Sequence, residues 1–227
     1  MRFNEIDSRI TLPSHHSKNV ILGPDEFVLC PHCEGPHILT TMISGNTFGA
    51  VFWSDGWMDA PMMMEYPIIV ACVHCGEVFD IEVVTRIEEK DFHQVGDMSP
   101  AYLREVSEDQ CIKYASTHEE LNQLREWQIR IRAYQMGNHA SRRSKKPRDW
   151  STMSLSNARR LVQICGRGVV EQLIKAEVLR SIGEFDDAVE VLDELTPDDE
   201  LTASMSRQIR AHLNKRSRQV FEPELPK

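Results

Sequence analysis

The chain has 227 residues, of which 41% are hydrophobic and 27% are charged, and its formal net charge is −9. This length suffices for one large or two small packed domains. A net negative charge disfavours nucleic acid and anionic membranes as partners of the chain as a whole. The charge is also unevenly spread. Residues 1–95 carry 5 Lys and Arg against 14 Asp and Glu, whereas residues 96–227 carry 21 against 21. We therefore expect two units with different surfaces.

The N-terminal stretch, residues 1–24, is polar and has few signals for helix or strand, so it is expected to form a loose tail. It lacks the apolar core of a secretion signal. No apolar run approaches the roughly 20 residues that span a bilayer. We therefore expect a cytoplasmic protein that does not associate with membranes and whose thiols stay reduced or bind metal.

Residues 25–95 contain short β-rich runs that predict a small antiparallel β unit. The runs are HILTTMI, NTFGAVFW, YPIIVAC and EVFDIEVV. In the last run Phe79, Ile81 and Val83 alternate with acidic residues, which predicts one half-buried strand. Two apolar arms surround Ser54-Asp55-Gly56, which predicts a β-hairpin inserted into the unit.

Two Cys-x-x-Cys motifs, Cys30–Cys33 and Cys72–Cys75, carry the chemistry of this unit. The first, Cys-Pro-His-Cys, also occurs as the active site of thioredoxin-fold thiol oxidases. Such an oxidase needs the motif at the start of a helix, whose N–H groups lower the pKa of the first thiol. Here Glu34-Gly35-Pro36 follows, and this run opposes a helix. The local sequence therefore disfavours the redox interpretation.

The second pair favours a metal site instead. Four thiolates in two tight turns suit a tetrahedral zinc ion. Gly76 and Gly35 are expected to let each turn curl, although Gly35 falls one residue late. Four thiolates leave no open position for water, so a zinc ion held by them is expected to be structural rather than catalytic. His32 and His74, the third residues of the two motifs, are expected to point outward.

The segments CPHCEG and CVHCGE resemble the two knuckles of the zinc-ribbon superfamily, over roughly residues 28–85. The resemblance implies that one Zn²⁺ is bound by Cys30, Cys33, Cys72 and Cys75. More loosely, SGNTFGAVFWSDG beside two such knuckles resembles a group of uncharacterised bacterial zinc-ribbon proteins, which implies no activity. The remaining Cys111 and Cys165 are expected to be reduced and partly buried.

The hairpin segment is a candidate partner-binding surface, because it carries two indoles and several polar groups. Its candidate residues are Asn46, Trp53, Asp55, Trp57 and Asp59. Such a surface suits a peptide or a cationic ligand. Alternatively, the tryptophans cover a small sheet and Asp55-Gly56 forms the turn, and this structural role is the one expected.

From Ser99 onward the pattern becomes helical. Ser99-Pro100 predicts the start of one helix, and Thr117 with Glu120 predicts a capping box before a second helix that ends at Gly137. Residues 99–137 are thus expected to form a helical segment and 138–151 a basic linker. Helices are then predicted within 152–218, at about 154–166, 168–182, 185–195 and 199–218.

Ala176–Leu195 resembles the turn and second helix of a tetratricopeptide repeat, with Gly183 at the turn and Ala188 at the small packing position. A stable array needs about three or more repeats. An ordinary helical hairpin explains the same residues, and both interpretations stay open.

The basic run RRSKKPR, Arg142–Arg148, could bind phosphates, could lie on the acidic half of the chain, or could be a solvated linker. Of these three roles, the solvated linker is the one expected. The two halves are nevertheless expected to dock, with the Met62–Met64 loop and the helix of Trp127 adding apolar contact. Phosphate loops, nucleophile elbows and dinucleotide fingerprints are absent from the sequence.

The sequence thus predicts an α+β protein, with a zinc ribbon and inserted hairpin followed by a helical region. Its predicted function is that of a non-enzymatic, cytosolic adaptor that binds another protein. The alternatives are a nucleic-acid-associated ribbon and a thiol-based redox protein.

Overall fold

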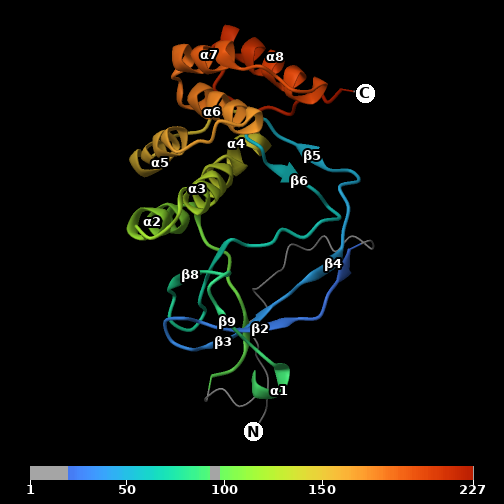
Figure 1. Ribbon diagram of the computed structural model, residues 1–227, viewed down its shortest axis with the longest axis vertical. Helices are drawn as coiled ribbons and strands as arrows, with labels where there is room; N and C mark the ends of the chain where they lie inside the picture. Colours follow the sequence, from blue (N-terminus) through green and yellow to red (C-terminus); the bar gives the residue numbers. More distant parts are fainter. Residues whose placement is uncertain (1–19, 93–97, 227) are drawn as a thin grey trace.

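A computed structural model describes residues 20–92 and 98–226. Short strands gather at one end of the elongated molecule and a stack of helices at the other (Figure 1). The predicted α+β architecture is confirmed. Most of the predicted tail, residues 1–19, lies outside the described residues.

The strands within the described residues are β1 (Ile21–Leu22), β2 (Glu26–Leu29), β3 (Pro36–Leu39), β4 (Met42–Ser44), β5 (Val51–Phe52), β6 (Met58–Asp59), β7 (Ile69–Ala71), β8 (Val78–Asp80), β9 (Thr85–Ile87) and β10 (Ala101–Tyr102). The helices are α1 (Glu89–Phe92), α2 (Glu108–Thr117), α3 (Gln123–Gly137), α4 (His139–Ser144), α5 (Thr152–Gln163), α6 (Val169–Ile182), α7 (Phe185–Glu194) and α8 (Glu200–Asn214). Of these helices, none is both long and apolar enough to cross a membrane.

Within the described residues, the β unit contains a four-stranded sheet, the short antiparallel pair β1–β4 and a separate hairpin. The sheet order is β10-β3-β2-β9, with β10 parallel to β3 and the other pairs antiparallel. Strands β7 and β8 form the antiparallel hairpin. Between the sheet and the hairpin lies an apolar cluster of Val28, Leu39, Val70, Phe79, Ile81 and Val84, together with Cys30 and Cys72. The two cysteine motifs are therefore anchored in a shared core.

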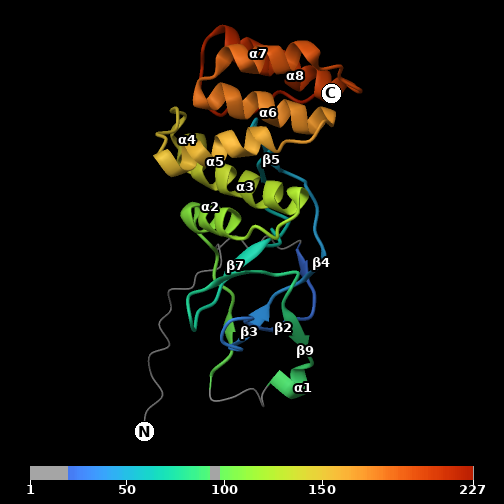
Figure 2. The same cartoon turned by 60° about the vertical axis from the view of Figure 1, so that its left-hand side comes forward.

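The inserted hairpin is confirmed as β5 and β6, in which Val51 pairs with Asp59 and Phe52 with Met58. It does not stay with the ribbon. Figure 2 shows the chain rising from β4 along the side of the molecule to place β5 among the helices. The hairpin thus reaches the helical half.

The single strand predicted for EVFDIEVV is wrong, because β8 ends at Asp80 and β9 begins at Thr85. The Asp80 carboxylate accepts a hydrogen bond of 2.8 Å from the backbone N–H of Glu82 and so closes a turn. Ile81 remains buried, but Val83 is exposed. The alternation of apolar and acidic residues therefore continues through this turn, so it does not mark where the first strand ends.

The helix start predicted at Ser99-Pro100 is also wrong. Ala101 and Tyr102 pair with His37 and Ile38 of the sheet instead. Helix α2 begins at Glu108, where Ser107 and Gln110 form a capping box. The start of the helix differs from the prediction because residues 101–102 pair with a distant strand, which the local sequence does not indicate.

The capping box predicted for Thr117 and Glu120 is likewise replaced. Thr117 ends α2, and α3 is capped by Asn122, whose side chain accepts from the Arg125 N–H. The end of α3 at Gly137 is confirmed.

The stretch expected to be a basic linker, residues 138–151, contains the short helix α4. Its Arg142 is buried and forms an ion pair with Asp55, while Arg148 forms one with Glu108. These two arginines are therefore structural, and the expectation of a fully solvated linker is wrong for them.

Helices α6 and α7 form the hairpin expected at Gly183. Gly183 has φ +94°, in the left-handed region, and Ala188 is fully buried. Leu173, Ala176, Leu192 and Ile209 pack together in the core of α6, α7 and α8. This is the helical hairpin that both open interpretations required.

The two halves share a core, and the helix predicted to take part in it, that of Trp127, contributes as α3. Ile69 and Ala71 of the ribbon pack with apolar residues of α2 and α3, among them Ile112 and Ile129. The Arg125 guanidinium of α3 forms an ion pair with the buried Asp80 and donates a 3.2 Å hydrogen bond to the carbonyl of Ile68. The second cysteine motif is thus one residue from the contact between ribbon and helices.

Candidate metal centre

The first motif forms a tight turn between β2 and β3. The N–H of Glu34 donates to the Cys30 carbonyl at 2.9 Å, and the N–H of Cys30 donates to the Gly35 carbonyl at 3.0 Å. The N–H of His32 faces the Cys30 sulfur at 3.4 Å. These bonds bring Cys33 back beside Cys30.

The second motif repeats this turn between β7 and β8. The N–H of Gly76 donates to the Cys72 carbonyl at 3.0 Å, and the N–H of Cys72 donates to the Glu77 carbonyl at 2.9 Å. The N–H groups of His74 and Cys75 face the Cys72 sulfur at 3.3 and 3.4 Å. The two motifs are therefore equivalent knuckles.

The glycine roles differ from the prediction in the first knuckle. Gly76 has φ +80° in the second knuckle, and its counterpart in the first is Glu34, with φ +57°. A non-glycine residue is strained there. Gly35 serves a different need, because a Cβ at that position would lie 2.5 Å from the His74 ring. It permits close approach of the two knuckles.

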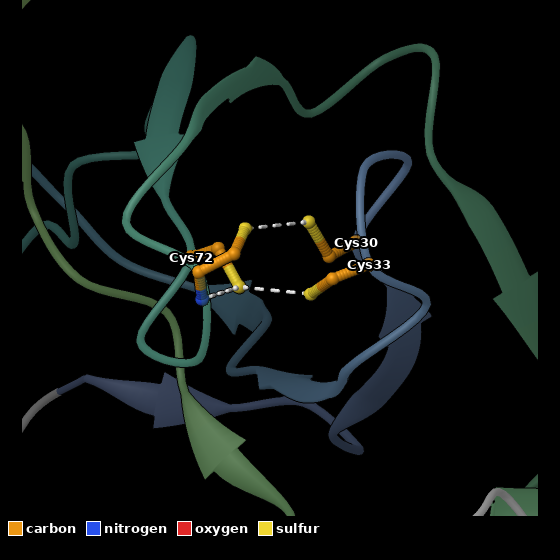
Figure 3. A group of neighbouring side chains, drawn as sticks. Cys30, Cys33 and Cys72 are labelled. Carbon is orange, nitrogen blue, oxygen red and sulfur yellow. Dashed lines mark hydrogen bonds between the residues drawn. The ribbon is translucent and has the colours of Figure 1, made fainter.

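The four sulfur atoms of Cys30, Cys33, Cys72 and Cys75 lie within 4.8 Å of one another. Across the knuckles, the sulfur of Cys30 lies 3.8 Å from that of Cys75. The sulfur of Cys33 lies 3.6 Å from that of Cys72, as Figure 3 shows. A tetrahedral zinc ion with Zn–S bonds of about 2.3 Å separates its sulfurs by about 3.8 Å. The spacing therefore fits one metal ion at the centre of the cluster.

The thiols differ in their surroundings. Cys30 and Cys72 are buried, Cys33 is half-buried and Cys75 is exposed. Burial raises the pKa of the Cys30 thiol to about 12. Burial also acts to raise the pKa of Cys72, but the N–H groups that face its sulfur outweigh this effect and lower it. A raised pKa at Cys30 is the opposite of what a thiol oxidase needs at its first cysteine.

His37 is a site residue that sequence reasoning missed. Its ring is fully buried, and its Nε2 lies 3.3 Å from the Cys72 sulfur. Burial lowers the pKa of His37, which favours a neutral imidazole with one N–H. In the tautomer with its proton on Nε2, this ring supports a sulfur ligand from outside the coordination shell. Its place four residues after Cys33 is the one available signal. His32 and His74 are exposed.

The candidate partner-binding residues of the hairpin differ in their exposure to solvent. Asn46 and Asp59 are exposed, and Trp53 and Trp57 are half-buried. Asp55 is fully buried, where it accepts hydrogen bonds from Asn138 Nδ2 at 3.0 Å and the Trp57 N–H at 3.1 Å besides its ion pair with Arg142. Asp55 is thus engaged inside the molecule.

The guanidinium groups of Arg132 and Arg142 lie 4.6 and 5.0 Å from the centre of the Trp57 ring. Ser54 Oγ donates to Glu177 at 2.6 Å and accepts from the Phe221 N–H at 3.1 Å. The hairpin turn is therefore fixed against helices and the C-terminal segment at Phe221, rather than held open to solvent.

Comparisons with protein-family models, with curated proteins and with solved structures find no match to this chain. Function is therefore inferred from its own residues.

Proposed function

We propose that the four cysteines bind one structural Zn²⁺, and that the protein is a non-enzymatic, cytoplasmic adaptor that binds another protein. The observation that carries the proposal is the set of four sulfur atoms from two equivalent knuckles, all within 4.8 Å of one another. An all-sulfur donor set suits zinc and leaves no coordination position for a substrate or water.

A stabilising role for the ion follows from where its ligands sit. Cys30 and Cys72 belong to the apolar cluster between the sheet and the β7–β8 hairpin. A β unit of this size has a thin core and gains from a metal staple. Because Ala71 packs on α2 and α3, the ion also supports the contact with the helices.

The adaptor role is supported by two features. The ion is held by a closed ligand set, which argues against metal catalysis. Part of the basic segment is engaged internally, since Arg142 pairs with Asp55 and Arg148 with Glu108, which weakens the case for a nucleic-acid surface. A cytoplasmic location fits the six cysteines, none of which forms a disulfide within the described residues.

Elemental analysis of the purified chain tests the metal centre. One zinc per chain is expected. Cys72→Ser should lose it and unfold the ribbon, because binding energy and folding energy are shared in such sites. Cys165→Ser is the matched control, because that sulfur lies outside the cluster and donates to the Glu171 carbonyl at 3.0 Å, a bond that serine retains. Absence of metal, or equal loss in both variants, contradicts the proposal.

The adaptor role needs a separate test. Cross-linking of the zinc-loaded chain in native cells, followed by mass spectrometry, should give one recurrent protein partner. Turnover of a dithiol substrate by the zinc-loaded chain would instead support the redox alternative.

A further inference from the structure

The four sulfurs of the metal centre differ in how easily solvent reaches them. Cys75 is exposed and Cys33 is half-buried. Cys30 and Cys72 are only 1% and 0% exposed. The space beside Cys75 is open, because a Cβ at the next residue, Gly76, would meet no neighbouring atom within 4 Å. Oxidation of a cysteine follows the thiolate character and the exposure of its sulfur. An oxidant from solvent therefore meets the cluster first at Cys75.

The Cys30 sulfur is placed to react with an oxidised Cys75. The two sulfurs lie 3.8 Å apart across the knuckles, and a disulfide needs them about 2.05 Å apart. The Cys72 sulfur is held inside its own turn instead. The N–H groups of His74 and Cys75 face it at 3.3 and 3.4 Å. Nε2 of the buried His37 lies 3.3 Å from the same sulfur. A disulfide across the knuckles, from Cys30 to Cys75, leaves these contacts of Cys72 in place.

The second knuckle is directly joined to the contact between ribbon and helices. Cys72 follows Ala71, whose N–H donates to the Arg104 carbonyl at 2.9 Å and whose carbonyl accepts from the Arg104 N–H at 3.2 Å. Ala71 is fully buried and packs with apolar residues of α2 and α3. A change in the ligand set is therefore felt one residue from the bridge that ties the ribbon to the segment before α2.

We propose that the cysteine cluster is a peroxide-sensitive switch, in which hydrogen peroxide joins Cys30 and Cys75 in a disulfide and thereby releases the ion and loosens the ribbon from the helices. The inference rests on the proposed zinc site. The Cys75 thiolate attacks one peroxide oxygen, which forms the S–O bond of a sulfenic acid and expels hydroxide. A metal-bound cysteine is a thiolate, so the Cys30 sulfur attacks the Cys75 sulfur and expels the second hydroxide. Two sulfurs are oxidised and one peroxide is reduced. The thiolates that remain, Cys33 and Cys72, are too few to hold the ion.

Hydrogen peroxide added to the full zinc-loaded chain tests the proposal, with the released zinc measured by a chromogenic chelator. One zinc per chain should be released, and a thiol reductant with added zinc should restore binding. Peptide mapping without reduction should find Cys30 joined to Cys75. Dimedone, which traps sulfenic acids, should label Cys75 before any other cysteine. In the oxidised chain, hydrogen–deuterium exchange should become at least about tenfold faster at the N–H groups of Ala71 and Arg104 and stay unchanged in α6 to α8.

Two variants separate the role of the exposed sulfur from that of the cluster as a whole. Cys75→His keeps three sulfurs and one nitrogen, a ligand set that zinc accepts, but removes the exposed thiolate. Peroxide should therefore release its zinc at least about tenfold more slowly. Cys33→His is the matched control, because it makes the same change of ligand set and keeps Cys30 and Cys75. Its zinc should be released at a rate within about twofold of that of the unchanged chain. If either variant fails to hold zinc, trapping and mapping on the unchanged chain decide the matter.

Failure of the inference is distinguishable from failure of the proposed function. The switch is overturned, and the structural zinc site left intact, if the zinc-loaded chain keeps its ion in peroxide or forms a disulfide other than Cys30–Cys75. Labelling of another cysteine before Cys75, or equal slowing in Cys75→His and Cys33→His, has the same meaning. Unchanged exchange at Ala71 and Arg104 after oxidation overturns the effect on the helices. A chain that never holds zinc overturns both the switch and the proposed metal site.

Discussion

Replacing Asp55 tests how the inserted hairpin is held to the helices. Asp55 is fully buried and pairs with Arg142, which is itself only 5% exposed. Asp55→Ala removes the carboxylate and leaves that guanidinium buried with its 2.8 Å hydrogen bond to the Gln135 carbonyl and its position over Trp57. Removing one partner of a buried ion pair costs about 3–5 kcal/mol. We expect the free energy of unfolding to fall by that amount.

Urea unfolding followed by circular dichroism and by tryptophan fluorescence measures the loss. Asp59→Ala is the matched control, because Asp59 belongs to the same hairpin but is exposed, and it should change stability by less than about 0.5 kcal/mol. In the double variant Asp55→Ala/Arg142→Met the uncompensated charge is gone. Its cost should therefore be smaller than the sum of the single costs by at least about 1 kcal/mol. A loss below about 1 kcal/mol for Asp55→Ala, or simple additivity, would refute the buried clamp.

Three further predictions concern the knuckles and the helices. Glu34→Gly should raise the free energy of unfolding by about 0.5–1 kcal/mol, because glycine adopts the left-handed backbone conformation at this position without strain. Gly76→Ala should lower the free energy of unfolding by about 1 kcal/mol, because it introduces that strain in the second knuckle. Equal effects of the two variants in urea unfolding would contradict this prediction. His37→Phe should weaken zinc binding about tenfold in a competitive chelator titration, and unchanged affinity would show that the ring is mere packing. Glu126 accepts hydrogen bonds from Arg160 and Arg130, and these bonds hold the pKa of its carboxyl below the usual 4.5. The ionised carboxylate therefore stabilises the fold fully above about pH 4.5. This contribution to the free energy of unfolding is lost as the pH falls through the lowered pKa of the folded state. Glu126→Gln should therefore cost about 2 kcal/mol at pH 7 and much less near pH 3, and a pH-independent loss would contradict the assignment.

The cysteine cluster could be predicted from sequence because its geometry is local. Two residues between the cysteines force both sulfurs of a knuckle to one side, and the following N–H groups complete the turn. The inserted hairpin and the helices after Thr152 were also predictable, because each has its own turn or periodicity signal. Gly183 is the plainest case, since its left-handed backbone is what ends α6.

Other features depended on contacts distant in sequence. Residues Ala101–Tyr102 form a strand only because β3 offers an edge to pair with. Arg142 looked like part of a solvated run, yet the hairpin brings Asp55 to it across 87 positions. His37 carried only the signal of its place four residues after Cys33, because its role depends on the approach of Cys72 from the second knuckle. The local spacing of the cysteines thus predicts the metal ligands, whereas the groups that support these ligands depend on contacts between residues distant in sequence.

X-ray absorption at the zinc edge of the purified chain tests the metal centre most directly. The proposal predicts one zinc per chain with four sulfur neighbours at about 2.3 Å and no nitrogen or oxygen neighbour. Cys165→Ser should leave that shell unchanged, and Cys72→Ser should abolish it. A shell with fewer than four sulfurs, with an imidazole nitrogen such as that of His37, or with an open water position would contradict a closed structural site.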